Sequence, residues 1–113
     1  MGNATCEGES VTNRELTLLI ADDHQIVRDG LRLLAEREGL KTIGEAENGR
    51  ALVSKVLELK PSIVITDMAM PDLNGIEAVR QLRAARYGGV IIMFSMHADR
   101  RNVGDALKAG VNG

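Results

Sequence analysis

Acidic side chains follow two apolar segments of this sequence, and a hydroxyl follows a third. Asp22 and Asp23 come directly after LTLLIA, Asp67 comes after SIVIT, and Ser95 comes after VIIMF. Carboxylates gathered about 4 Å apart repel each other by roughly several kcal/mol. A hard divalent ion such as Mg²⁺ removes that repulsion and keeps waters that a phosphate can replace. The pattern therefore indicates magnesium-dependent phosphate chemistry, with Asp67 as the phosphoryl acceptor and Ser95 as a hydroxyl donor to the phosphoryl oxygens.

Each of these residues also has an ordinary structural explanation. Asp22 or Asp23 could cap a helix that begins near Gln25, although two adjacent carboxylates weaken that explanation. Asp67 could be a turn residue, and a serine at a strand end is uninformative by itself. His24 is expected at the surface or in packing rather than on a metal.

The apolar runs predict the strands of a parallel sheet that is buried on both faces. Leu16–Ala21, Ser62–Thr66 and Val90–Phe94 are continuous rather than alternating, and the more polar Thr42–Glu47 fits an edge strand. Segments with helical period lie between them. Their apolar stripes are Val27/Leu31/Leu34, Leu52/Val53/Val56/Leu57, Ile76/Val79/Leu82 and Val103/Ala106/Leu107. This alternation predicts an α/β fold with a doubly wound parallel sheet. If its strand order is 2-1-3-4, Val90–Phe94 is an edge strand. Such a sheet brings the carboxyl ends of its strands to one edge, where ligands bind.

The composition indicates one soluble domain that does not itself bind nucleic acid. Its 113 residues are 44% hydrophobic, and 14 basic against 16 acidic side chains argue against contact with a phosphate backbone. The single cysteine, Cys6, cannot form an internal disulfide, which favours a reducing cytosol. No apolar run approaches the roughly 18 residues that span a membrane. Residues 1–13 are expected to be a disordered segment, and residues 14–113 to be the folded domain.

Other candidate ligands and motifs receive structural explanations. Asp72 and Asn74 are better explained as turn and helix-cap residues before the third helix than as metal ligands. The methionines near the sheet edge are expected to fill gaps in the core. The sequence contains no glycine-rich nucleotide motif, no Walker lysine and no Cys/His zinc spacing.

At the acidic positions the chain resembles the receiver domain of two-component response regulators. The matching stretches are IADDHQIVRDGL, TDMAMPDLNGIE and MFSMHAD, and the resemblance covers roughly residues 16–113. DDHQIVRDGL, SMH and ALKAG look most like the LuxR/NarL/FixJ-type subfamily, whose receivers precede a helix-turn-helix DNA-binding domain. The resemblance implies a flavodoxin- and CheY-like fold and a signalling switch rather than an enzyme.

The resemblance also implies a role for each site residue. Asp67 would accept a phosphoryl group from the phosphohistidine of a sensor histidine kinase or from a small phosphodonor. Asp22, Asp23, Asp67 and the backbone carbonyl of Ala69 would bind Mg²⁺. Ser95 would be the hydroxyl that responds to phosphorylation.

Further expectations concern partners and completeness. A family receiver has a lysine after its fifth strand and an aromatic residue on that strand, and both would lie beyond Gly113, so the chain is expected to be an incomplete receiver. Lys108 is expected to face solvent and not to replace that lysine. DNA would be contacted only through an output domain outside these residues. The protein is expected to lie in the cytoplasm and to have no membrane anchor.

Two other hypotheses remain. The chain could form a homodimer or self-associate through the exposed fourth strand, VIIMF, and the fourth helix, because a flat apolar edge invites pairing. It could instead be a phosphohydrolase that uses an aspartyl phosphate. That hypothesis ranks last because Ala69 stands where a second catalytic aspartate is expected.

Overall fold

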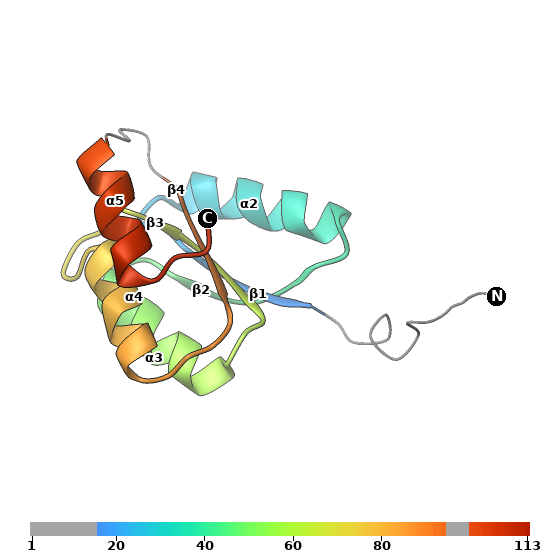
Figure 1. The fold of residues 1–113 in the computed structure, drawn as a ribbon. Helices are drawn as coiled ribbons and strands as arrows, with labels where there is room; N and C mark the ends of the chain where they lie inside the picture. Colours follow the sequence, from blue (N-terminus) through green and yellow to red (C-terminus); the bar gives the residue numbers. More distant parts are fainter. Residues whose placement is uncertain (1–15, 95–99) are drawn as a thin grey trace.

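A computed structural model describes residues 16–94 and 100–113 and shows a parallel sheet with helices on both faces (Figure 1). The strands are β1 (Thr17–Ala21), β2 (Lys41–Ala46), β3 (Ile63–Asp67) and β4 (Val90–Phe94). The helices are α2 (Gln25–Arg37), α3 (Gly49–Leu59), α4 (Gly75–Ala84) and α5 (Arg100–Ala109). The sheet order β2-β1-β3-β4 and the parallel pairing confirm the predicted fold. The disordered segment expected at residues 1–13 lies outside the described residues.

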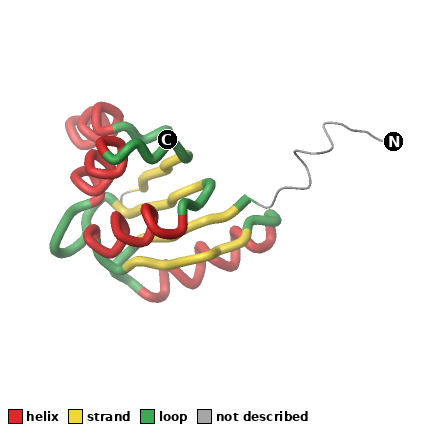
Figure 2. The backbone as a smooth tube through the Cα atoms, turned by 90° about the horizontal axis from the view of Figure 1, so that it is seen from below, coloured by secondary structure: helices red, strands yellow, loops and turns green. Residues whose placement is uncertain are grey.

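The hydrophobic core has two unequal halves, one on each face of the sheet. Strand β1 lies between β2 and β3, and its residues Leu18–Ala21 are completely buried because helices cover both faces. Helices α3 and α4 lie on one face of the sheet (Figure 2). Their buried side chains form the larger core cluster with those of the strands. Helix α2 packs on the other face against a smaller cluster that includes Leu18 and Ile20. Within the described ranges, no helix is both long and apolar enough to cross a membrane.

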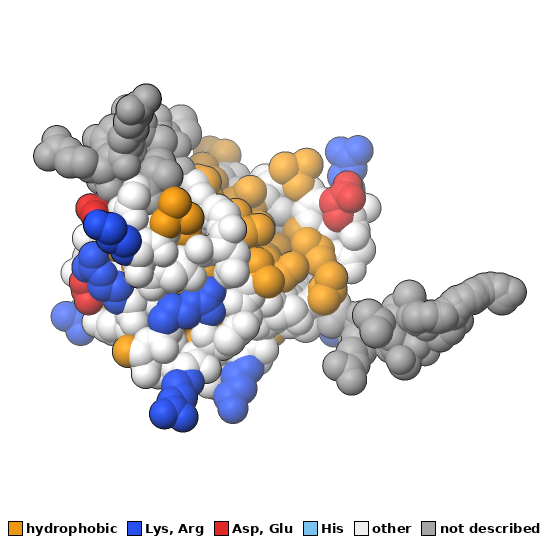
Figure 3. Space-filling view, in the orientation of Figure 1, with side chains coloured by type: hydrophobic (Ala, Val, Ile, Leu, Met, Phe, Trp, Pro, Cys, Tyr) orange, Lys and Arg blue, Asp and Glu red, His pale blue; other side chains and the backbone are white. Residues whose placement is uncertain are grey.

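The face that α2 covers remains partly open to solvent. The stripe Val27/Leu31/Leu34 was predicted to face the core, but Leu34 is 57% exposed, and Val90 and Ile92 of β4 are exposed as well. Figure 3 shows hydrophobic side chains gathered on this face beside α2. The prediction fails there because, in the part of the chain that the structure describes, α2 has no second helix beside it. Leu107 of α5, also predicted to be apolar and inward, is 59% exposed.

Side-chain caps define the N-termini of two helices. The Asn48 side chain accepts a hydrogen bond from the Ala51 amide at 2.8 Å, and the Asn74 side chain accepts one from Glu77 at 2.9 Å. Each cap satisfies an amide that has no partner within its helix. The predicted cap role of Asn74 is confirmed.

The last residues of the chain lie along the outer edge of β4. The Asn112 amide donates to the Ile91 carbonyl at 2.7 Å, and the Met93 amide donates to the Gly113 carbonyl at 2.8 Å. The Ile91 amide donates to the Asn112 side chain, which also accepts from Arg83. The expectation of an open β4 edge is therefore wrong at Ile91 and Met93, because residues 112 and 113 already occupy these backbone groups.

Candidate functional site

Asp22 stands one residue past the end of β1, at the carboxyl edge of the sheet. Its amide donates to the Ala46 carbonyl of β2 at 3.0 Å, so the sheet still holds its backbone. Its side chain is only 2% exposed and accepts the His24 amide at 2.7 Å. The N-cap residue of α2 is His24, which makes no side-chain cap. The alternative that Asp22 or Asp23 caps this helix therefore receives no support.

Asp22, Asp23 and His24 form a compact group at this edge. The His24 Nδ1 atom lies 3.0 Å from Oδ1 of both Asp22 and Asp23, and ligand atoms of the three residues all lie within 4.8 Å of one another. The hydrogen bond that the His24 ring donates to Asp22 raises the pKa of His24, and the negative charges of Asp23 and Asp67 raise it further. The two carboxylates thus attract positive charge to this point. His24 was predicted to be a surface or packing residue, and its side chain is indeed 69% exposed, although it also contacts both carboxylates.

Asp67 is the last residue of β3 and lies near this group. Burial raises the pKa of Asp67, and the charges of Asp22 and Asp23 raise it further, while backbone hydrogen bonds from Ala69 and Met68 oppose the change. The Ala69 amide donates to Asp67 Oδ1 at 3.3 Å, which is the contact expected if Asp67 is a turn residue. Within the described residues, Asp67 stands outside the 4.8 Å group of Asp22, Asp23 and His24. The structure thus brings Asp67 within electrostatic range of the pair, and Ala69 is exposed beside it.

The loop that follows β3 packs tightly against Asp67. Gly75, the first residue of α4, donates its amide to the Met68 carbonyl at 2.8 Å. A Cβ atom added at Gly75 would lie 2.2 Å from the Asp67 carbonyl oxygen. Only glycine permits this approach without a shift of the backbone. The start of α4 therefore fixes the main chain that carries the Asp67 carboxylate.

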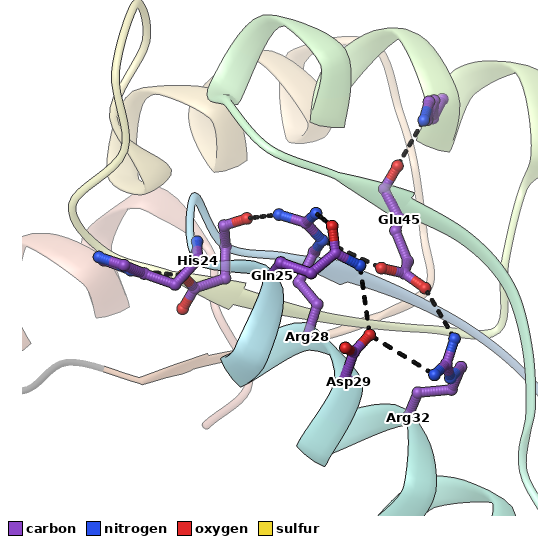
Figure 4. Close-up of polar contacts among 8 residues, drawn as sticks. His24, Gln25, Arg28, Asp29, Arg32 and Glu45 are labelled. Carbon is purple, nitrogen blue, oxygen red and sulfur yellow. Dashed lines mark hydrogen bonds and ion pairs between the residues drawn. The ribbon is translucent and has the colours of Figure 1, made fainter.

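A buried arginine on α2 donates to the backbone beside the acidic group (Figure 4). Arg28 Nη1 donates to the Asp22 carbonyl at 2.6 Å, its Nε to Glu45 Oε1 at 3.0 Å, and its Nη2 to Gln25 Oε1 at 3.1 Å. The sequence analysis missed Arg28. The only signal was its position among apolar residues near the start of a helix that follows the acidic pair.

Two remaining candidates are not part of the described site. Ser95, predicted as the switch hydroxyl, lies outside the described residues. Lys108 is exposed on α5, as predicted from its position in that helix.

Comparisons with known proteins identify the family of the chain. The profile of the response regulator receiver domain family matches residues 18–113. The transcriptional regulatory protein YdfI of Bacillus subtilis is 38% identical over 97 residues, which are 85% of this chain and 45% of that protein. This chain spans about half the length of the curated relatives that it matches.

Solved structures show the same fold. A LuxR-family two-component response regulator from an Aurantimonas species has a TM-score of 0.83 at 34% identity, covering 88% of this chain and 72% of that one. The CheX–CheY–BeF₃–Mg²⁺ complex from Borrelia burgdorferi has a TM-score of 0.86 at 25% identity, covering 92% of this chain and 79% of that one. Fold and sequence agree, and the chain belongs to the family of response regulator receiver domains, with relatives of the LuxR and NarL type.

Proposed function

We propose that this receiver accepts a phosphoryl group on Asp67 from the phosphohistidine of a sensor histidine kinase, in a Mg²⁺-dependent reaction in the cytoplasm. Phosphorylation then switches a DNA-binding output domain that controls transcription. The observation that carries the proposal is the position of Asp67 at the strand ends, where burial raises its pKa and the charges of Asp22 and Asp23 raise it further. The Borrelia burgdorferi complex, in which CheY was solved with BeF₃ and Mg²⁺, supports the same chemistry by similarity.

The donor set fits Mg²⁺. Hard cations prefer carboxylate and carbonyl oxygens, and the candidate ligands are the carboxylates of Asp22, Asp23 and Asp67 with the Ala69 carbonyl. The His24 ring nitrogen already lies 3.0 Å from both Asp22 and Asp23, so the pair attracts positive charge. Bound Mg²⁺ would neutralise the equatorial oxygens of the phosphoryl group during transfer.

The residues of the chain then have distinct tasks. A carboxylate oxygen of Asp67 attacks phosphorus, so that a P–O bond forms and the P–N bond to the kinase histidine breaks. The imidazole leaves with the electron pair of that bond. The Ala69 amide, which donates to Asp67 Oδ1, orients the carboxylate for attack. Ser95 would donate its hydroxyl to a phosphoryl oxygen and so report the modification.

Labelling with a small phosphodonor tests the role of Asp67. Incubation of the intact protein with acetyl phosphate and Mg²⁺ is expected to add one phosphoryl group, seen as a mass increase, and Asp67→Asn is expected to abolish it. Asp72→Asn is the matched control, because Asp72 is an exposed acidic residue five positions further along the same loop. Undiminished labelling of Asp67→Asn, or loss of labelling in the control, would contradict the assignment.

We also propose that the chain self-associates through side chains of β4 and α5. Support comes from the exposure of Val90, Ile92 and Leu107, which are large apolar residues on these two elements. Contact between copies would bury apolar surface that water now covers. Sedimentation at micromolar concentration is expected to show a dimer that Ile92→Glu converts to a monomer. A monomer in the parent chain at these concentrations would exclude this interface.

A further inference from the structure

We infer that Arg28 is a positioning residue for the metal site, because it fixes the peptide group between Asp22 and Asp23. This inference rests on the proposed function, since it concerns the same acidic pair. The hydrogen bonds of Arg28 go to the Asp22 carbonyl, Glu45 and Gln25, and not to the carboxylates of Asp22 and Asp23. Arg28 acts on these carboxylates through the main chain to which both are attached.

The geometry of this peptide group carries the inference. The Asp22 carbonyl belongs to the peptide that joins Asp22 to Asp23, and it accepts Arg28 Nη1 at 2.6 Å. The Asp22 amide donates to Ala46 of β2 at 3.0 Å. Both backbone polar groups of Asp22 are therefore held by distant parts of the chain. Because this peptide plane sets the directions from which the two side chains leave the backbone, Arg28 sets the spacing of the two carboxylates.

Burial and its own hydrogen bonds hold Arg28 in place, so it can fix the peptide group between Asp22 and Asp23. It is only 8% exposed, and a buried cation is tolerated only when its donors are bonded and its charge is paired. Glu45 provides the charge, at 3.0 Å from Nε, and Gln25 accepts from Nη2. Glu45 is in turn fixed by its place in β2 and by Lys55, whose ammonium donates to the Glu45 carbonyl. Figure 4 shows this chain of contacts leading from β2 through Arg28 to the backbone beside His24.

Arg32 provides a matched control on the same helix. It lies one turn beyond Arg28 and also pairs with Glu45, at 3.6 Å, but its other bond goes to Asp29. Its side chain is 38% exposed. Removing Arg32 therefore disturbs the same glutamate and the same helix without removing the donor to the Asp22 carbonyl.

Titration of the chain with Mg²⁺ alone, followed by the amide NMR shifts of Asp22 and Asp23, tests the inference. Residues that orient metal ligands typically contribute about tenfold or more to metal affinity. Arg28→Met is expected to weaken Mg²⁺ binding at least about tenfold, Arg28→Lys by an intermediate factor, and Arg32→Met by less than about twofold. Urea unfolding of each variant ensures that affinities are compared for folded molecules.

The outcomes separate the inference from the proposed function. If the parent chain binds Mg²⁺ and Arg28→Met binds it equally well, Arg28 is only a structural residue and the inference is overturned. An equal loss in Arg32→Met overturns it too, because the effect then follows Glu45 and not the Asp22 carbonyl. If the parent chain shows no Mg²⁺-dependent shifts at Asp22 and Asp23, the proposed metal site fails as well. Should Arg28→Met not fold, Arg28→Lys decides, and an affinity equal to that of the parent overturns the inference.

Discussion

Replacing Gly75 with alanine tests how tightly the start of α4 holds Asp67. The new Cβ would lie 2.2 Å from the Asp67 carbonyl oxygen and 3.1 Å from Met68 Cα, and both of these are backbone atoms that cannot rotate away. The helix or the end of β3 must therefore move by a large part of an ångström. Overpacking of this kind costs about 1–3 kcal/mol. Alanine recovers at most about 1 kcal/mol through its higher helix propensity, so Gly75→Ala is expected to be destabilising overall.

The control for this prediction is Gly30→Ala in the middle of α2. A Cβ at Gly30 meets nothing within 4 Å, so only the propensity gain remains, and the free energy of unfolding should rise by about 0.5–1 kcal/mol. Urea unfolding followed by far-ultraviolet circular dichroism measures both variants. Gly75→Ala should also shift the amide signals of Asp67 and Met68. A Gly75→Ala variant as stable as the parent, with those signals unmoved, would refute the reasoning.

Two further predictions concern the opposite end of the sheet. The Tyr87 hydroxyl donates to the Pro61 carbonyl, and burial raises the pKa of Tyr87 above its ordinary value. The neutral phenol therefore stabilises the fold below about pH 10, and this contribution is lost as the pH rises through the raised pKa. The free energy of unfolding, measured in urea across this range, should fall less steeply with pH in Tyr87→Phe than in the parent chain. An equally steep fall in both would contradict the prediction. Arg83 donates to three backbone carbonyls and to the Asn112 side chain, so Arg83→Met is expected to lower the free energy of unfolding by at least about 2 kcal/mol. The exposed Arg80 pairs with Glu77, so Arg80→Met is expected to lower the free energy of unfolding by only about 0.5 kcal/mol or less. Equal losses in the two variants would show that the Arg83 bonds add nothing.

The strands could be predicted from sequence because burial on both faces leaves a strong local pattern. The run Val90–Phe94 matches β4 residue for residue, and the weaker Thr42–Glu47 corresponds to the edge strand β2 within one residue at each end. Parallel pairing followed from the alternation of strands and helices. The strand order did not, because doubly wound sheets occur in more than one order, and it came from the resemblance to CheY-like receivers. These features depend on short stretches of sequence, so one sequence is sufficient to predict them.

The features that could not be predicted depend on contacts between distant residues. Arg28 looks like any polar residue of an amphipathic helix until Glu45, seventeen positions away, is placed beside it. Leu107 fits an apolar stripe, but whether the stripe is covered depends on which neighbours reach it. The pairing of Asn112 with Ile91 has no local pattern at all, because it joins a short segment after a helix to a strand edge.

The central place of β1 also restricts how the chain can fold. Its pairing with β2 brings Thr17 to Lys41, whereas its pairing with β3 brings Leu18 to Ile63, across a much longer intervening segment. Closing the longer loop costs more chain entropy, and contacts between residues far apart in sequence slow folding. The unit of β1, α2 and β2 is therefore expected to assemble before β3 arrives. The site at the strand ends, which needs both Asp22 and Asp67, would be completed only in the later step.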